Sequence, residues 1–534
     1  MVQAAPSRRL ALQVAAIAAA VTIAGSLVVT APSSAATPKN PVAGAVMHVP
    51  AATFTKVVVP GTTAMTAAPA RLLRRYGYLE QEYYVAGTAC RYRITDPLAN
   101  AQVVDCGAPY KTRMIVRRPA NPNRFNGTAT VEWNNVSTGQ DIDFVWAATH
   151  DYQMSHGYAS ISVSAQLNGL NALKAWSPER YGTLTLAASN TDPATGGILD
   201  RTGDVLSWDV FSQTVEGLRH PAAVNPLPGI RVKRVNATGE SQSALRLTPY
   251  YNSIDPLHRV VDGIVYYDAA GQLRTDSPTK AISVATEIGV GLLPSGLPAP
   301  DGVNYRRWEL AGTSHVSLSD IDYVDPIVLR DGFLKLPDGT PSTLTGLTTG
   351  CAWYPLWSTV PTGYVLDSAF EHVNAWVKGG SPAPTAPRLQ RDPNAPPLFD
   401  PAAPGGVAPG YAKDANGNTV GGIQLAEYAY PTAVIKGAGN TGPATCWLAG
   451  LHRFFTDQEL AARYSEPDSY LLGVTHLTAR NLSEGLILPR DAAQTLRDAC
   501  IVYRHLRRLD DDHSAERVSD AAETREVHRC GSRS

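Results

Sequence analysis

Short apolar runs bounded by polar turns recur through the middle of the chain, and segments with helical spacing lie between them. Runs rich in β-branched and aromatic residues predict strands, and apolar residues three or four positions apart predict helices. The predicted strands cover residues 80–85, 112–118, 128–133, 158–165, 231–237, 260–267, 280–285 and 304–311. The predicted helices cover 144–154, 204–219, 242–251, 367–378, 457–464 and 491–506. This alternation predicts an α/β fold with a mostly parallel sheet and helices on both faces.

Composition divides the 534 residues into parts of different character, and the chain is longer than one ordinary core requires. A core is expected over 75–380, after an extended lead-in over 37–74 that is rich in Pro, Ala and Val. The irregular stretch at about 168–200 is a candidate lid-like insertion. Residues 381–506 are expected to form a C-terminal extension packed on the core, followed by a charged, mobile tail over 507–534.

The N-terminus has the layout of a secretory signal peptide over residues 1–36. Arg8 and Arg9 precede an apolar run from Leu10 to Val29, and small residues lead to a cleavage site near Ala36. A membrane anchor is the alternative, since the run is long for a signal peptide, but many of its residues are weakly apolar alanines. The arginine pair also partly matches a twin-arginine signal, which leaves the export route open. We therefore expect a secreted or cell-envelope protein of a bacterium, without a stable membrane anchor after cleavage.

Six cysteines remain after that cleavage, an even number that in an exported protein indicates disulfides. Cys90 and Cys106 bracket a short segment between two predicted strands and are the first expected pair. Cys351 with Cys446 is a second expectation, and the partner of Cys500 stays open. The chain has no Cys-x-x-Cys, so no thiolate metal site and no cofactor are predicted.

The charge balance argues against a nucleic-acid partner. The chain has 46 basic and 47 acidic residues, for a formal net charge of −1. No long-range field therefore favours a polyanion, and a small molecule is the expected partner.

The stretch Gly239-Glu240-Ser241-Gln242-Ser243 stands between a predicted strand and a predicted helix. It nearly matches the G-x-S-x-G elbow, in which a sharp turn presents a nucleophilic serine. Small residues are needed two positions either side, because strand and helix pass close together there; Ser243 replaces the second glycine. The alternative interpretation is a serine-rich turn in which Ser241 only caps the helix.

An acid and a histidine follow the serine at the ends of later strands, where functional groups of parallel sheets gather. The strand 280–285 ends in Thr286-Glu287, and the strand 304–311 leads to Gly312-Thr313-Ser314-His315. A serine hydroxyl needs an imidazole to take its proton, and the imidazole needs an acid to orient it. We expect Glu287 to be that acid and His315 the base; Asp268, at the end of strand 260–267, competes with Glu287.

An oxyanion hole needs two donors aimed at the developing alkoxide. One is expected to be the backbone N–H of Gln242, next to the nucleophile. The other is expected from the loop after strand 128–133, at the backbone of Asn135.

The chain resembles a bacterial family described as an alpha/beta hydrolase domain, over about residues 45–500. The matching stretches are Val131-Glu-Trp-Asn-Asn-Val-Ser, Gly239-Glu-Ser-Gln-Ser-Ala, Thr286-Glu287 and Arg307-Trp-Glu-Leu-Ala-Gly-Thr-Ser-His315. The resemblance implies the α/β-hydrolase fold with Ser241 as nucleophile, Glu287 as acid and His315 as base. The chain departs from the family in its acid loop, which commonly reads S-E-T-D and here reads Thr286-Glu287-Ile288-Gly289.

These residues lead to the hypothesis of an exported serine hydrolase that cleaves small or lipid-like carboxylic esters through an acyl-enzyme. An amidase or peptidase with the same three residues is one alternative, because leaving-group preference depends on pocket shape. A binding protein that kept the fold without catalysis is the other, and fold alone does not decide between them.

Overall fold

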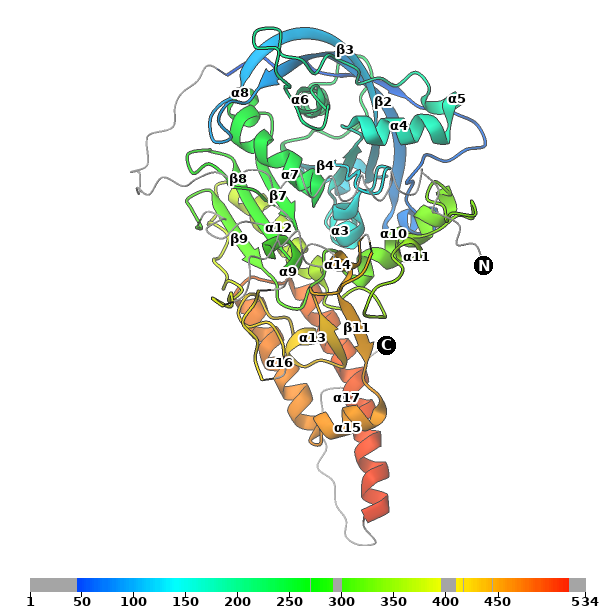
Figure 1. Cartoon of the computed structure of the whole chain (residues 1–534), viewed down its shortest axis with the longest axis vertical. Coiled ribbons are helices and arrows are strands. Elements are labelled where there is room, and N and C mark those ends of the chain that lie inside the picture. The colour runs from blue at the N-terminus through cyan, green and yellow to red at the C-terminus, as the bar shows by residue number, and fades with distance from the viewer. Residues whose placement is uncertain are drawn as a thin grey trace, which may run out of the picture.

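The structure is a computed structural model that describes residues 46–268, 270–291, 300–394, 410–415, 417–443 and 445–517, with side chains up to 510 (Figure 1). The expected signal peptide, 1–36, lies outside these residues, as does most of the expected tail. The strands are β1 (Thr53–Lys56), β2 (Tyr78–Arg93), β3 (Gln102–Pro119), β4 (Thr128–Trp133), β5 (Ala159–Val163), β6 (Arg234–Glu240), β7 (Gly263–Tyr267), β8 (Lys280–Ala285), β9 (Tyr305–Glu309), β10 (Ala433–Lys436) and β11 (Leu451–Phe454).

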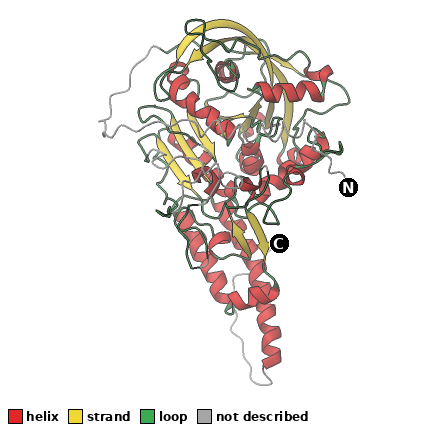
Figure 2. Cartoon of the chain, in the orientation of Figure 1, coloured by secondary structure: helices red, strands yellow, loops and turns green. Residues whose placement is uncertain are grey.

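Helices occupy most connections between the strands (Figure 2). They are α2 (Ala70–Tyr76), η2 (Pro122–Arg124), α3 (Phe144–Ser155), α4 (Leu167–Trp176), α5 (Pro178–Tyr181), α6 (Ser207–Arg219), α7 (Gln242–Pro249), η3 (Tyr250–Ile254), α8 (Asp255–His258), α9 (Glu287–Gly291), α10 (Leu318–Asp331), α11 (Leu344–Leu347), α12 (Thr362–Trp376), α13 (Ala426–Ala429), α14 (Cys446–Ala449), α15 (Asp457–Arg463), α16 (Pro467–Ser483) and α17 (Pro489–Arg517).

One nine-stranded sheet organises the core, in the order β1-β2-β3-β5-β4-β6-β7-β8-β9. The strands from β5 to β9 in this order pair in parallel, and β1, β2 and β3 add an antiparallel edge. The parallel strands are short and almost entirely buried, as expected where helices cover both faces. The predicted mostly parallel sheet is confirmed, and the two predicted edge strands are longer than the sequence indicated.

Alternating side chains of β7 show how the two faces are filled. Ile264 and Tyr266 belong to the apolar cluster that includes α6 and α7, whereas Val265 and Tyr267 belong to the cluster that includes α3 and α12. Successive residues of a strand point to opposite faces, so a run that is apolar throughout can fill two cores at once. Both helix layers are thereby packed against the same strands.

Two expectations about organisation need correction. The lead-in 37–74 is not simply extended, since β1 pairs with β2 at the sheet edge and α2 begins at Ala70. Helix α17 continues to Arg517, so the chain does not lose regular structure at 507. Helices α4 and α10 were not predicted; α10 is held at its start by Ser317, whose hydroxyl accepts from the Asp320 N–H at 3.4 Å.

The C-terminal extension forms an arm below the sheet in Figure 1, where α16 and α17 run side by side. Tyr470, Val474 and Leu477 of α16 pack against Ala499 and Leu506 of α17 in a cluster of their own. Other apolar side chains of the extension, such as Tyr428, Ile435 and Ile487, belong to the core cluster that includes α3 and α12. The strands β10 and β11 form a small antiparallel sheet between this arm and the core.

Candidate active site

Ser241 stands at the sharp turn between β6 and α7 that the sequence predicted. Its backbone φ of 53° and ψ of −117° are unusual for a residue with a side chain. A Cβ on Gly239 would lie 2.9 Å from Oγ of Ser243, so only glycine fits there. The hydroxyl of Ser243 accepts from the Glu240 N–H at 3.0 Å and donates to the Glu240 carbonyl oxygen at 2.9 Å. Ser243 therefore fastens the turn at the position where a glycine was expected.

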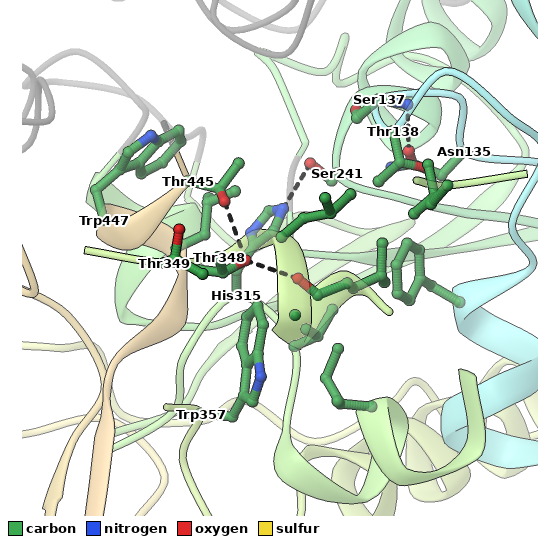
Figure 3. Close-up of a pocket in the computed structure, with 18 of the residues that line it drawn as sticks. Asn135, Ser137, Thr138, Ser241, His315, Thr348, Thr349, Trp357, Thr445 and Trp447 are labelled. Atoms are coloured by element: carbon green, nitrogen blue, oxygen red, sulfur yellow. Dashed lines mark hydrogen bonds between the residues drawn. The ribbon is translucent and has the colours of Figure 1, made fainter. Parts of the chain in front are cut away.

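His315 reaches Ser241 from the loop after β9 (Figure 3). Its Nε2 lies 2.7 Å from the Ser241 Oγ, within hydrogen-bond distance. Gly312 starts this loop with φ of 76°, and a Cβ there would lie 2.2 Å from the Tyr428 ring. Ser358 holds the loop from outside, with its N–H donating to Ser314 Oγ at 2.8 Å and its hydroxyl donating to the Gly312 carbonyl at 2.5 Å. The histidine is thus presented by a loop fixed at both ends.

The acid that contacts His315 is Asp268, and the expectation that Glu287 makes this contact is wrong. Oδ2 of Asp268 accepts a hydrogen bond from Nδ1 of His315. Asp268 directly follows β7, the strand next to β6, and its φ of 56° turns the side chain toward the histidine loop. Asp268 is the competing candidate at the end of β7, and the acid expected from the sequence, Glu287, lies one strand too far along the sheet.

The stretch around Glu287 supports Asp268 instead of replacing it. Oδ1 of Asp268 accepts from the N–H of Thr286 at 2.7 Å, from the Thr286 hydroxyl, and from the N–H of Gly289 at 3.1 Å. A Cβ on Gly289 would lie 2.2 Å from that same oxygen, so a side chain there would displace the acid. The loop therefore holds the carboxylate in place.

Glu287 is buried and forms a hydrogen bond to the backbone of the histidine loop. Its Oε1 accepts from the N–H of Gly312 at 2.7 Å. Burial raises the pKa of its carboxyl, and Lys413 opposes this rise. Glu287 thus acts on the position of the loop that carries His315 and makes no direct contact with the imidazole among the hydrogen bonds and ion pairs of the described residues.

A second carboxyl group, that of Glu240, also faces His315. Glu240 is not among the site residues expected from the sequence. Its Oε1 lies 3.1 Å from His315 Nε2, the nitrogen that contacts Ser241. Burial raises the pKa of Glu240 to about 8, although His315 opposes the rise. Burial on its own lowers the pKa of His315, but Asp268 and Glu240 outweigh it, so the pKa of the imidazole is raised. A signal was present in the sequence, since Glu240 immediately precedes the serine.

The two backbone N–H groups expected to form the oxyanion hole differ in whether they already have a hydrogen-bond partner. Gln242 is the first residue of α7, where a backbone N–H has no partner within the helix. The N–H of Asn135, in contrast, donates to the carbonyl of Ile142 at 2.9 Å, so this part of the expectation is wrong. The Asn135 side chain instead donates from Nδ2 to Oε2 of Glu240 at 2.7 Å. Asn135 orients a carboxyl group of the site through this bond.

A cavity of about 250 Å³ opens beside Ser241 and His315. Most of its wall is apolar, and hydroxyl groups add local polarity (Figure 3); they belong to Ser137, Thr138, Thr348, Thr349 and Thr445. The apolar lining residues are Phe144, Val316, Ile321, Leu334, Leu336, Pro337, Leu344, Leu347, Trp357, Trp447 and Leu448. No lining residue comes from 168–200, where the lid was expected. Much of the wall comes instead from 334–357 and 445–448, and the rest comes from 135–144, 240–241 and 315–321.

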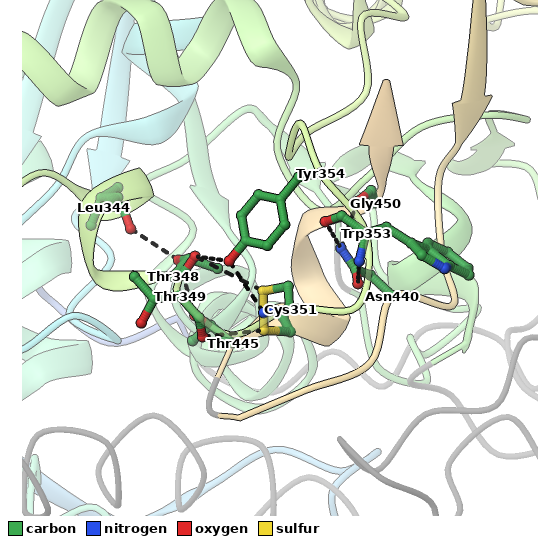
Figure 4. Close-up of a disulfide and its surroundings, with 10 residues drawn as sticks. Leu344, Thr348, Thr349, Cys351, Trp353, Tyr354, Asn440, Thr445 and Gly450 are labelled. Atoms are coloured by element: carbon green, nitrogen blue, oxygen red, sulfur yellow. Dashed lines mark hydrogen bonds between the residues drawn. A yellow bond between two sulfur atoms is a disulfide. The ribbon is translucent and has the colours of Figure 1, made fainter. Parts of the chain in front are cut away.

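The expected disulfide Cys351–Cys446 joins these two wall segments (Figure 4). Cys351 follows the lining residues Thr348 and Thr349, and Cys446 lies between Thr445 and Trp447. The hydroxyls of Thr348 and Thr445 are 3.2 Å apart beside the bridge. The disulfide Cys90–Cys106 is also present and lies in the β2–β3 hairpin.

Replacing both Cys351 and Cys446 with serine is expected to lower the free energy of unfolding by about 4 kcal/mol, since the bridge closes a loop of 95 residues. The KM of a substrate that binds in the cavity should rise as well, because the cavity wall loses its covalent link. Denaturant unfolding and steady-state kinetics measure the two effects.

The matched control replaces Cys90 and Cys106, which close a loop of only 16 residues. We expect this double variant to lose about 3 kcal/mol while its KM stays that of the parent. An equal rise of KM in both double variants would show that the Cys351–Cys446 bridge has no special influence on the cavity.

The described residues contain no cluster of three metal-ligating side chains. Within the same residues, every helix is too short or too polar to cross a bilayer.

Comparison with known proteins gives one extended match. A family model described as an alpha/beta hydrolase domain matches residues 41–497. A search of proteins with curated function found no match.

Solved structures that resemble the chain share little sequence with it. A putative acetyl xylan esterase from Bacteroides fragilis aligns at 10% identity and a TM-score of 0.24, over 50% of this chain and 56% of that one. The esterase Est22, in its S188A mutant, aligns at 12% identity and a TM-score of 0.26, over 59% and 84%. A rice cell wall degrading esterase from Xanthomonas oryzae aligns at 10% identity and a TM-score of 0.21, over 46% and 51%. The chain thus spans little more than half the length of the first of these.

Proposed function

Since the chain belongs to the alpha/beta hydrolase domain family, we propose that it is a serine hydrolase that cleaves carboxylic esters with Ser241, His315 and Asp268. The observation that carries this proposal is the continuous contact from the Ser241 hydroxyl through the imidazole to the Asp268 carboxyl. Such an arrangement lets a weakly nucleophilic hydroxyl lose its proton as it attacks.

In the proposed reaction, Ser241 Oγ attacks the ester carbonyl carbon while its proton moves to Nε2 of His315. Asp268 stabilises the imidazolium and keeps Nδ1 protonated. The tetrahedral oxyanion accepts a hydrogen bond from the N–H of Gln242. When the carbon–oxygen bond to the alcohol breaks, the alcohol takes the proton from Nε2. Water then attacks the acyl-enzyme by the same route, with His315 again taking a proton and returning it to Ser241.

The cavity favours an uncharged substrate with an apolar acyl or alcohol group of modest size. Its wall is formed mainly by Leu, Trp, Phe and Val side chains, and its volume of about 250 Å³ is just below the usual range for ligand pockets. Burying a charged substrate group against this wall would cost several kcal/mol without a partner. We therefore place short to medium uncharged esters first among substrates, with export to the cell exterior as the proposed location.

A fluorophosphonate probe tests the proposal, because only an activated serine forms the phosphonyl adduct. We expect stoichiometric labelling, with the adduct mapped by mass spectrometry to the peptide that contains Ser241. Esters and anilides with matched acyl groups then separate an esterase from an amidase. Absence of labelling and of turnover on both substrate sets would favour a binding protein on this fold.

A further inference from the structure

Glu240 contributes to the site in two ways. Its backbone is part of the turn that carries Ser241, and its side chain lines the cavity. It is the last residue of β6, it is 1% exposed, and it lines the cavity together with Ser241 and His315. One carboxyl oxygen, Oε2, is held by Asn135 at 2.7 Å. The other, Oε1, has no hydrogen bond within the described residues and lies 3.1 Å from His315 Nε2. A buried carboxyl oxygen without a hydrogen bond is unusual and indicates a functional role.

Nε2 of His315 therefore has two partners at short range, the hydroxyl of Ser241 at 2.7 Å and the carboxyl of Glu240 at 3.1 Å. With Nδ1 protonated toward Asp268, a neutral imidazole offers a single lone pair at Nε2. A protonated Glu240 carboxyl and the serine hydroxyl would compete to donate to that lone pair. When Nε2 carries a proton instead, an ionised Glu240 carboxylate attracts it.

We propose, on the basis of the proposed serine hydrolase function, that Glu240 is a positioning residue that controls when Nε2 of His315 is free to accept the Ser241 proton. The imidazole is held between two carboxyl groups, Asp268 at Nδ1 and Glu240 at Nε2. At low pH the pair formed by Glu240 and His315 retains its protons and Nε2 is occupied. At higher pH Nε2 becomes free, and the Glu240 carboxylate then stabilises the imidazolium that forms as Ser241 attacks.

The groups around Glu240 act on its ionisation in opposite directions. The charged or titratable side chains facing Glu240 come from the end of β7, from α10 and from the histidine loop; they are Tyr267, Asp268, Asp320 and His315. Asp268 and Asp320 make ionisation of Glu240 harder, and His315 makes it easier. Asn135 adds a neutral donor that fixes the carboxyl without changing the net charge.

The sign of the effect follows from these charges. Removing the Glu240 carboxyl removes an attraction for the imidazolium, so the pKa of His315 should fall. Neutral imidazole then becomes available at lower pH, and the acid limb of the kcat/KM profile should move to lower pH by about one unit. The kcat at high pH should fall, because the developing imidazolium loses a compensating charge. A purely structural role would lower activity at every pH without moving the limb.

The direct experiment is NMR titration of histidines labelled at Cε1, with the His315 signal assigned by its loss in His315→Asn. Glu240→Gln keeps the acceptor for Asn135, and Glu240→Ala removes both oxygens; each should lower the pKa of His315 by about one unit. Glu240→Asp, which restores a carboxyl group, should recover part of the shift. The matched control is Glu287→Gln, which neutralises another buried carboxyl. This carboxyl bonds to Gly312 and makes no contact with the imidazole among the described residues. The control should leave the pKa of His315 unchanged.

An unchanged His315 pKa in both Glu240→Gln and Glu240→Ala would overturn the inference. If the acid limb of the kcat/KM profile also stayed at the parent pH while the rate fell at every pH, the role of Glu240 would be structural only. Failure of the proposed function has a different signature, since the titration needs no substrate. A protein that shows the His315 shift and hydrolyses no ester would retain the Glu240 inference and lose the esterase proposal.

Discussion

Ser241→Ala is expected to reduce kcat for ester hydrolysis by roughly 10⁶-fold and to abolish fluorophosphonate labelling. The loss is large because no other atom can form the acyl-enzyme while His315 accepts its proton. The side chain of Ser241 forms its hydrogen bond to His315, so its removal should change the unfolding free energy little. Burst kinetics and the labelled-peptide map measure the chemical effect, and thermal unfolding measures the structural one.

Ser243→Ala provides the contrast two residues away. Its hydroxyl bonds to the backbone N–H and carbonyl of Glu240, so this variant should lose stability by about 1 kcal/mol and retain labelling at Ser241. The serine turn would be misassigned if Ser243→Ala lost all labelling in a folded protein while Ser241→Ala kept its turnover.

Asp268→Asn is expected to lower kcat by about 10⁴-fold with a small change in substrate binding. The neutral amide stabilises the imidazolium less well, and its NH2 group, if turned toward His315, favours the wrong tautomer. Oδ1 of Asp268 is held by Thr286 and Gly289, so an asparagine can keep its carbonyl oxygen there and present NH2 to Nδ1. Steady-state kinetics should show the loss in kcat and leave KM near its parent value.

Glu287→Gln is the control for that substitution, since it makes the same chemical change in a neighbouring buried carboxyl. A glutamine can still accept from the Gly312 N–H, so we expect a fall in kcat of less than about tenfold and some loss of stability. The reverse ranking, with Glu287→Gln inactive and Asp268→Asn active in folded proteins, would mean that Glu287 is the acid after all.

Local patterns were sufficient for most strands of the large sheet and for two members of the site. Strand β4 was predicted with its observed bounds, because an apolar run beside a turn signal depends on neighbouring residues only. The serine turn was readable for the same reason, since Gly239 is required by the close approach of strand and helix within one short stretch. His315 followed from its loop after a buried strand.

Other features depend on contacts between distant parts of the chain, which no local pattern contains. Helices α4, α10 and α16 were missed because tertiary packing outweighs local propensity there; α10, for example, contains Pro326, which a local pattern takes as a helix breaker. Two segments of the cavity wall, 334–357 and 445–448, lie about a hundred positions apart in the sequence. The cysteine pair Cys351–Cys446 was the only sign in the sequence that they meet.

By itself the sequence determined the main strands of the large sheet, its mostly parallel character and the presence of Ser241, His315 and two candidate acids. Only the tertiary structure decided between the acids, because Asp268 and Glu287 both end buried strands and the choice depends on the direction in which each turn sends its carboxyl group. The φ of 56° at Asp268 turns that carboxyl to His315, whereas Glu287 bonds to the backbone of Gly312. The position of Glu240 against Nε2 was likewise a result of folding, since it needs β6 and the histidine loop to meet at one edge of the sheet.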